Sequence, residues 1–266
     1  MSELIISYTN IAQESISIIF LMILIITCLL QKETLATTNT LAIIAILCVG
    51  LLAVQILQWV DYINILSVDT YLPTSGRELY VRYLFLLDFG LSYLITFALF
   101  RYMQILVEFL SVSQKESITL STKPNKVLII LGVLVGAFML SDIWLHNVYL
   151  FDEGGIAHPT YGSLIILASL FVCPAVSIFT IIRYRKILGK YDGWLLAIYN
   201  LAMLILLPVS FVNNLSISYV AIPILIYILY FGIDIRRGQE YIQQEAVIAQ
   251  REAQLEEMNL QMMVSQ

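Results

Sequence analysis

Charged residues are scarce in this chain. Only 12% of its 266 residues are Asp, Glu, Lys or Arg, whereas 60% are hydrophobic and the mean hydropathy is +0.87. A soluble domain carries roughly 25% charged residues, so this composition is typical of a membrane protein, whose partner is the lipid bilayer. The net charge of −5 leaves no basic face for a phosphate backbone, which excludes nucleic acid as a partner.

Cysteine and histidine are equally sparse. The three cysteines, Cys28, Cys48 and Cys173, each lie inside an apolar run, where a thiol behaves as a small hydrophobe. We therefore expect no disulfide framework, no metal site and no cofactor. The first ten residues contain no Lys or Arg and so lack the basic start of a cleavable signal peptide. The first hydrophobic run is expected to be retained as a membrane span.

Seven apolar runs approach the roughly 20 residues that a helix needs to cross the hydrocarbon layer. They cover residues 12–30, 41–60, 80–101, 127–146, 161–182, 193–211 and 216–234. The sequence therefore predicts an all-α fold with a seven-helix transmembrane domain over residues 1–234. The rest, residues 235–266, is expected to form a cytoplasmic coiled-coil helix.

None of the seven runs contains a lysine. The six lysines lie between them, at Lys32, Lys115, Lys123, Lys126, Lys186 and Lys190. A retinal protein needs a lysine within the membrane for its Schiff base, so that class is excluded. A transporter usually shows inverted repeats and broken helices. No repeat is detected here and the runs contain few prolines, so a transporter or lipid-binding membrane protein is the weaker alternative.

The basic residues indicate the orientation in the membrane. Twelve of the fourteen lie at one set of run ends: the six lysines together with Arg101, Arg183, Arg185, Arg236, Arg237 and Arg251. Only Arg77 and Arg82 lie on the other side. Because basic loops stay in the cytoplasm, we expect an external N-terminus and a cytoplasmic C-terminal tail.

Polar residues crowd the halves of the runs that this orientation places outside. They predict an outward-facing ligand pocket formed by Trp59, Asp61, Arg82, Asp88, Asp142, Trp144 and His146. Two other interpretations stay open: the acids pair internally with Arg82 or His146, and the aromatic residues form an interfacial belt. The excess of acids suits a cationic or hydrogen-bond-donating ligand, whether small molecule, peptide or lipid. It suits a proton sensor equally, because burial raises the pKa of a carboxylate.

The tail carries a weak seven-residue repeat. Its apolar positions are Tyr241, Ile248, Leu255 and Met262, and the companion positions are mostly polar. The repeat predicts a parallel homodimeric coiled coil of marginal stability, which can switch between two packings. A solvated, half-frayed tail is the alternative.

The last residues, "LQMMVSQ" (Leu260 to Gln266), resemble the segment that precedes the phosphorylated-histidine box in Lyt-type sensor histidine kinases. That box and any Gly-rich ATP-binding segment are absent from this chain, so we expect no catalytic residue and no enzymatic activity in it. The resemblance implies a bacterial cell-membrane receptor of a two-component system, with a kinase module beyond the tail. The implied further partner is a response regulator with a Lyt-type DNA-binding domain.

A second resemblance covers the membrane region. The stretch "HNVYLFDEGGIAHPTYGSLII", which runs from His146 to Ile166, is similar to the seven-helix sensory region of some bacterial histidine kinases and diguanylate cyclases. It implies signal transduction, and it leaves a diguanylate cyclase as the alternative output.

Overall fold

The computed structural model describes residues 2–30, 36–67, 75–113, 122–152, 156–213 and 217–264. Its α-helices are α1 (Ser2–Leu30), α2 (Ala36–Ser67), α3 (Ser75–Ser113), α4 (Lys123–Leu145), α5 (Tyr161–Arg183), α6 (Arg185–Asn213), α7 (Ile217–Leu229) and α8 (Arg236–Val264). A π-helical turn, η1 (Tyr230–Ile235), joins α7 to α8. The predicted all-α class fits this architecture. The sequence did not predict the small antiparallel hairpin of β1 (Tyr149–Phe151) and β2 (Ala157–Pro159).

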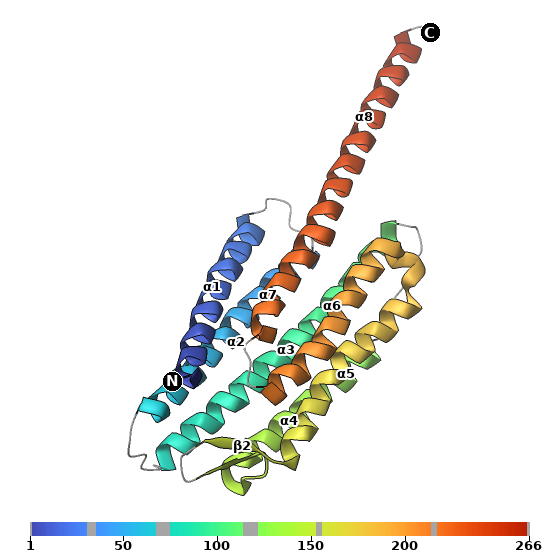
Figure 1. Ribbon diagram of the computed structural model, residues 1–266. Helices are drawn as coiled ribbons and strands as arrows, with labels where there is room; N and C mark the ends of the chain where they lie inside the picture. Colours follow the sequence, from blue (N-terminus) through green and yellow to red (C-terminus); the bar gives the residue numbers. More distant parts are fainter. Residues whose placement is uncertain are drawn as a thin grey trace.

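Consecutive helices of the bundle run in opposite directions (Figure 1). The N-terminus and the hairpin therefore lie at one end, called the hairpin end below, and α8 leaves from the other, called the α8 end. Helix α3 is central, because it contacts α2, α4, α5 and α6. Helix α7 packs against α1, α2 and α6.

Among the residues that the structure describes, five helices are long and apolar enough to cross a membrane: α1, α2, α3, α4 and α5, over Glu3–Leu30, Ala36–Ile65, Gly76–Val112, Lys123–Leu145 and Tyr161–Arg183. This is the character of a multi-pass membrane protein. The helices extend past most of the predicted runs; α3, for example, covers Ser75–Ser113 where the apolar run covered 80–101. Hydropathy marks only the part of a helix that suits hydrocarbon, whereas the backbone hydrogen bonds continue into the polar ends.

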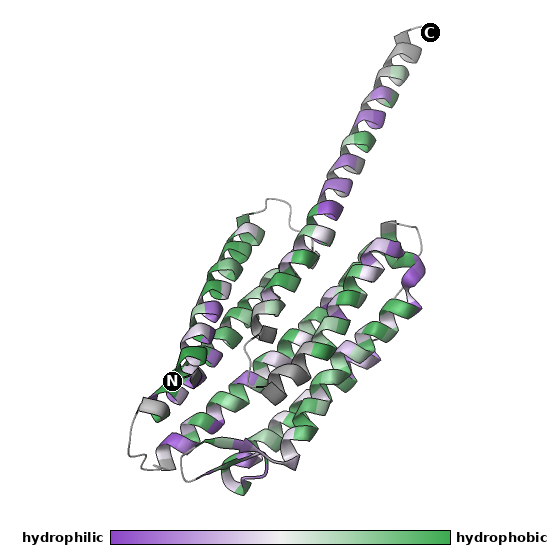
Figure 2. Ribbon diagram, viewed as in Figure 1, coloured by the Kyte–Doolittle hydropathy of each residue, from purple (hydrophilic) through white to green (hydrophobic). Residues whose placement is uncertain are grey.

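The outer surface of the bundle is apolar and its interior partly polar. On α4, for example, Val133 and Leu134 are exposed, whereas Asp142 is buried. Figure 2 shows hydrophobic residues over most of the bundle and a mainly hydrophilic α8. Because lipid tails solvate apolar side chains, this inverted distribution suits a membrane and would be costly in water.

Short-range signals fix the ends of α4 and α5. A proline lies in the first turn of α4, where no intrahelical donor is lost, and His146 ends the helix in a left-handed conformation (φ 50°). Thr160 caps α5 by accepting a hydrogen bond from the Gly162 N–H at 3.2 Å. A side chain at Gly162 would collide with the Asn147 carbonyl. The hairpin is therefore held close to the bundle at both of its ends.

The last helical segment continues from the bundle into α8, which projects away from it (Figure 1). At 1.5 Å per residue, the 29 residues of α8 extend about 43 Å. The domain boundary that we drew at residue 234 thus falls inside an uninterrupted helical run. Of the predicted dimer positions, Ile248 and Leu255 are each 55% exposed. The other two, Tyr241 and Met262, are not among the residues whose side chains the structure describes.

Candidate functional site

A buried ion pair lies at the hairpin end of the bundle. Arg82 of α3 donates through Nη1 to the carboxylate of Asp142 on α4, and to the Asp142 carbonyl at 3.2 Å. The two side chains are 4% and 5% exposed. The Arg82 Nε is buried and has no hydrogen-bond acceptor among the described residues. The Arg82 Nε–H group is therefore a buried donor for which the described residues provide no acceptor.

The same pair anchors the hairpin. The second carboxylate oxygen of Asp142 accepts hydrogen bonds from the backbone N–H groups of Val148 and Tyr149. The Arg82 guanidinium carbon lies 4.9 Å from the centroid of the Phe151 ring, a cation–π contact. One acid and one base thus connect α3, α4 and β1.

Asp88 lies on the same helix as Arg82 and is bonded to Gln55 of α2, whose Nε2 donates to Oδ1. Tyr149 of β1 stacks on Phe85 of α3, with ring centroids 4.2 Å apart. Burial raises the pKa of the Tyr149 phenol, and the nearby carboxylates of Asp88 and Asp142 raise it further. The phenol therefore stays protonated at neutral pH, and the two acids face a common neighbour beneath the hairpin.

Two other predicted site residues lie on α2, in pairs of their own. Asp61 forms a bidentate ion pair with Arg77, with N–O distances of 2.6 and 3.0 Å. The indole of Trp59 donates to the buried Glu14 of α1 at 3.1 Å. These contacts join α2 to α3 and to α1.

Trp144 and His146 lie at the exposed end of α4. Trp144 is 73% exposed, and His146 is exposed as well. The structure thus gathers Arg82, Asp88 and Asp142 beneath the hairpin, and it leaves Trp144 and His146 outside that group. In the described parts of the chain, no cluster of three or more His, Cys, Asp or Glu residues is placed to hold a metal ion.

The structure also reveals a second charged cluster, at the α8 end, that sequence reasoning missed. Asp192 of α6 is 1% exposed and is bonded by both Arg236 and Arg237 of α8. Desolvation lowers the pKa of Arg237, but its contacts with Asp192 and Glu240 outweigh this and raise the pKa overall. A signal was present, because Asp192 is the one acid beside the basic stretch from Arg183 to Lys190.

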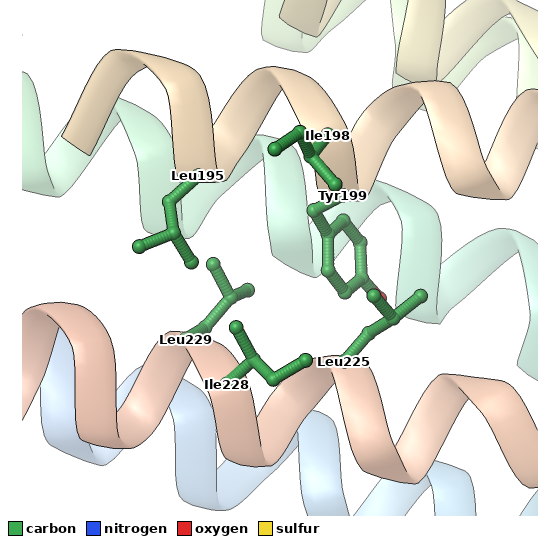
Figure 3. Close-up of a pocket in the computed structure, with 6 residues that line it drawn as sticks. All are labelled: Leu195, Ile198, Tyr199, Leu225, Ile228 and Leu229. Atoms are coloured by element: carbon green, nitrogen blue, oxygen red, sulfur yellow. The ribbon is translucent and has the colours of Figure 1, made fainter. Parts of the chain in front are cut away.

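An apolar crevice of about 240 Å³ lies between α6 and α7 (Figure 3). Its lining residues are Leu195, Ile198 and Tyr199 on α6 and Leu225, Ile228 and Leu229 on α7. Ile198 and Ile228 are 57% and 46% exposed, so the crevice opens onto the lipid-facing surface of the bundle. Lipid tails suit such a surface, because five of the six lining side chains are wholly apolar and the sixth is that of Tyr199.

Comparison with known proteins identifies no family: the chain matches no protein-family model and no curated protein.

Proposed function

We propose that this chain is the membrane sensor region of a bacterial two-component histidine kinase, that it perceives a stimulus at the hairpin end, and that it passes the signal through α8 to a cytoplasmic kinase. The observation that carries the proposal is the helical run α7–η1–α8, which leads from the bundle core to a projecting helix. A displacement of α7 within the bundle must move α8, because helical hydrogen bonds leave no flexible joint between them.

In this proposal α6 and the run α7–η1 are the sixth and seventh spans, and α8 lies in the cytoplasm. The charge distribution supports the orientation. At the α8 end, the end of α5 and the start of α6 expose Arg183, Arg185, Lys186 and Lys190. At the hairpin end, Arg77 and Arg82 are each bonded to a carboxylate. The unneutralised basic charge among the described residues is thus concentrated at the α8 end, as expected for the cytoplasmic face.

The stimulus acts at the group formed by Arg82, Asp88, Asp142 and Tyr149. A cationic or hydrogen-bond-donating ligand would compete for the two carboxylates, and protons would compete in the same way. Either event would loosen the hairpin, since Asp142 bonds both Arg82 and the backbone N–H of Tyr149 at the start of β1. Because the same helix α3 reaches η1, where the Tyr102 hydroxyl donates to Asp234 at 3.1 Å, it offers a route through the bundle.

The output side of the proposal is a parallel dimer. Two chains in one membrane present their α8 helices side by side, and the half-exposed Ile248 and Leu255 lie on one face of the helix. Membrane tethering raises the effective concentration enough for a weak seam to pair.

A chimera tests the function. The chain is joined after Gln266 to a Lyt-type kinase module, and autophosphorylation with ATP is measured in membrane vesicles. Insertion of one to six residues after Gln266 should change the activity, and insertion of seven should restore it, because seven residues return a coiled-coil helix to nearly the same face. Asp88→Asn, introduced without an insertion, should also change the activity.

The competing function has its own readout. If the kinase activity is the same with and without the insertions and is unchanged by Asp88→Asn, the sensor proposal fails. If, in addition, reconstituted vesicles take up a solute only when Asp88 is intact, a transporter replaces it. The crevice between α6 and α7 favours a lipid-binding role only if a lipid co-purifies with the chain and is lost on Ile228→Trp, which would fill the crevice.

A further inference from the structure

The turn η1 (Tyr230–Ile235) is unusual because it is π-helical. A π-helical turn holds one residue more than the α-helical turn it replaces, and such turns occur frequently at functional sites. If η1 relaxed to an α-helix, everything after it would rotate by about 100° and advance by about 1.5 Å relative to α7, the increments of one α-helical residue. The π-helical turn therefore sets the face that α8 presents.

Three contacts fit only the observed phase of this helix. Asp234 is buried and accepts a hydrogen bond from the Tyr102 hydroxyl of α3 at 3.1 Å. Gly232 lies so close to α6 that an added Cβ would be 3.0 Å from Leu195. Asp192 bonds Arg236 and Arg237, and its side chain is fully buried. These contacts reach α8 and η1 from α3 and α6.

Of these three contacts, the one between Asp192 and the two arginines restricts the rotation of α8 most strongly. Neighbouring residues on a helix point about 100° apart, so both guanidinium groups reach one carboxylate only over a narrow range of helix rotation. Arg236 also stacks over the Tyr191 ring, 4.7 Å from its centroid. Asp192 itself follows the break at Gly189 (φ 74°) within α6, the helix that also contacts η1.

Relaxation of η1 would exchange these contacts for poorer ones. A one-residue shift would put Ile235 in the place of Arg236, so Asp192 would keep at most one arginine. The same shift would put Ile233 in the place of Asp234 and leave the Tyr102 hydroxyl without that acceptor. The observed contacts therefore favour the π-helical phase over a regular α-helix.

We infer that Asp192 is a positioning residue that holds α8 in the phase set by η1, and that weakening its bonds to Arg236 and Arg237 lets η1 relax and α8 rotate. The use of this rotation for signalling rests on the proposed function, whereas the rotation itself does not. The two arginines are 37% and 24% exposed, so water can solvate them when they leave Asp192. The element can therefore have two states, as a switch requires.

Pulsed electron paramagnetic resonance tests the inference within a single chain. Spin labels are placed at Lys186, near the start of α6, and at Gln243 on α8, both of which are exposed. The three native cysteines are buried, and dilution with unlabelled chain suppresses distances between chains. In lipid nanodiscs, Asp192→Asn should shift or split the distance distribution by several ångströms, up to about 8 Å for a side chain on a helix that turns by 100°.

Three control variants make the test specific, and a fourth variant serves if Asp192→Asn does not fold. Asp192→Glu retains the charge and should keep the wild-type distance, and Asp152→Asn, in an exposed pair on the hairpin, should have no effect. Deletion of Gly232 removes the extra residue, so α8 should stay in its original phase and Asp192→Asn should cause no further shift. If Asp192→Asn does not fold, Arg237→Gln weakens the same contact at a partly exposed side chain and should shift the distance in the same direction.

An unchanged distance in folded Asp192→Asn or Arg237→Gln would overturn the inference, as would an equal shift with and without Gly232. Because the readout is a distance within one chain, it does not depend on a kinase, a dimer or a stimulus. A rotation with no effect on the chimera's activity would therefore count against the proposed function alone.

Discussion

Arg82 and Asp142 illustrate why a charged pair within a membrane bundle is costly to break. Both side chains are almost fully buried, and Asp142 additionally accepts two backbone N–H groups of the hairpin. Removing one partner leaves the other charge buried, which typically costs about 3–5 kcal/mol, whereas replacing both partners together costs far less. The pair thus stabilises the bundle only as long as it stays complete.

This asymmetry gives a first prediction. Arg82→Gln and Asp142→Asn should each strongly lower the thermal midpoint of the detergent-solubilised chain. The loss of thermal midpoint in the double variant should be smaller than the sum of the two single losses. Asp152→Asn alters the exposed contact between the Asp152 and His158 side chains and is the control, because exposed pairs contribute about 1 kcal/mol or less. Additive losses in the double variant would show that the two side chains do not act as a pair.

Two glycines give a second prediction. Gly162 lies against the Asn147 carbonyl, so Gly162→Ala must push the start of α5 away from the hairpin, at a cost of about 1–3 kcal/mol. Gly136, within α4, has nothing within 4 Å of an added Cβ. Gly136→Ala should therefore be neutral or slightly stabilising, since alanine favours a helix by up to about 1 kcal/mol. Thermal melts that rank the two variants the other way would contradict the packing.

Sequence reasoning found the charged residues of the hairpin end but not all of their partners. A lone Asp88 or Asp142 in an apolar run is conspicuous, and pairing of acids with Arg82 was one open interpretation. Which acid meets Arg82 depends on how α3 and α4 pack, across 60 residues of sequence. Trp144 resembles a pocket residue by position, but its rotation on α4 turns it outward.

The helices were the predictable elements, and the turns were not. Apolar runs of sufficient length locate helices, and the polar, Pro-free sequence after Arg236 locates α8. The hairpin has three-residue strands, too short for an alternating pattern to be recognised. The π-helical turn η1 leaves no mark in "YFGIDI", because it arises from tertiary contacts of Asp234, Arg236 and Gly232.

A third prediction concerns α8 as an element. In membranes, cysteines at Ile248 or Leu255 should form disulfides between chains, because both residues lie on the proposed seam and are half-exposed. Cysteines at Gln250 or Gln254 lie about 200–240° around the helix from Ile248 and should not crosslink. Equal crosslinking at all four positions, or none at any, would indicate a tail that does not pair.

Hydropathy and the alternating directions of the helices do not determine which end of the molecule faces the cytoplasm. Only the distribution of charge distinguishes the two orientations. An inverted bundle would bury and expose the same side chains. The difference lies in the free energy of holding basic residues on the translocated side, which is what the positive-inside rule describes. The α8 end carries four exposed basic residues at the junction of α5 and α6, namely Arg183, Arg185, Lys186 and Lys190, whereas the two arginines of the hairpin end are each paired with a carboxylate.

Labelling of intact cells tests this orientation. With the N-terminus outside, an impermeant maleimide should react with His158→Cys, whose native side chain on the hairpin is 59% exposed, and should spare Lys186→Cys at the start of α6. The wild-type chain is a clean control, since Cys28, Cys48 and Cys173 are all buried. After the cells are permeabilised, Lys186→Cys should become reactive. Labelling of Lys186→Cys but not His158→Cys in intact cells would invert the bundle, place α8 outside, and remove the basis for a cytoplasmic kinase.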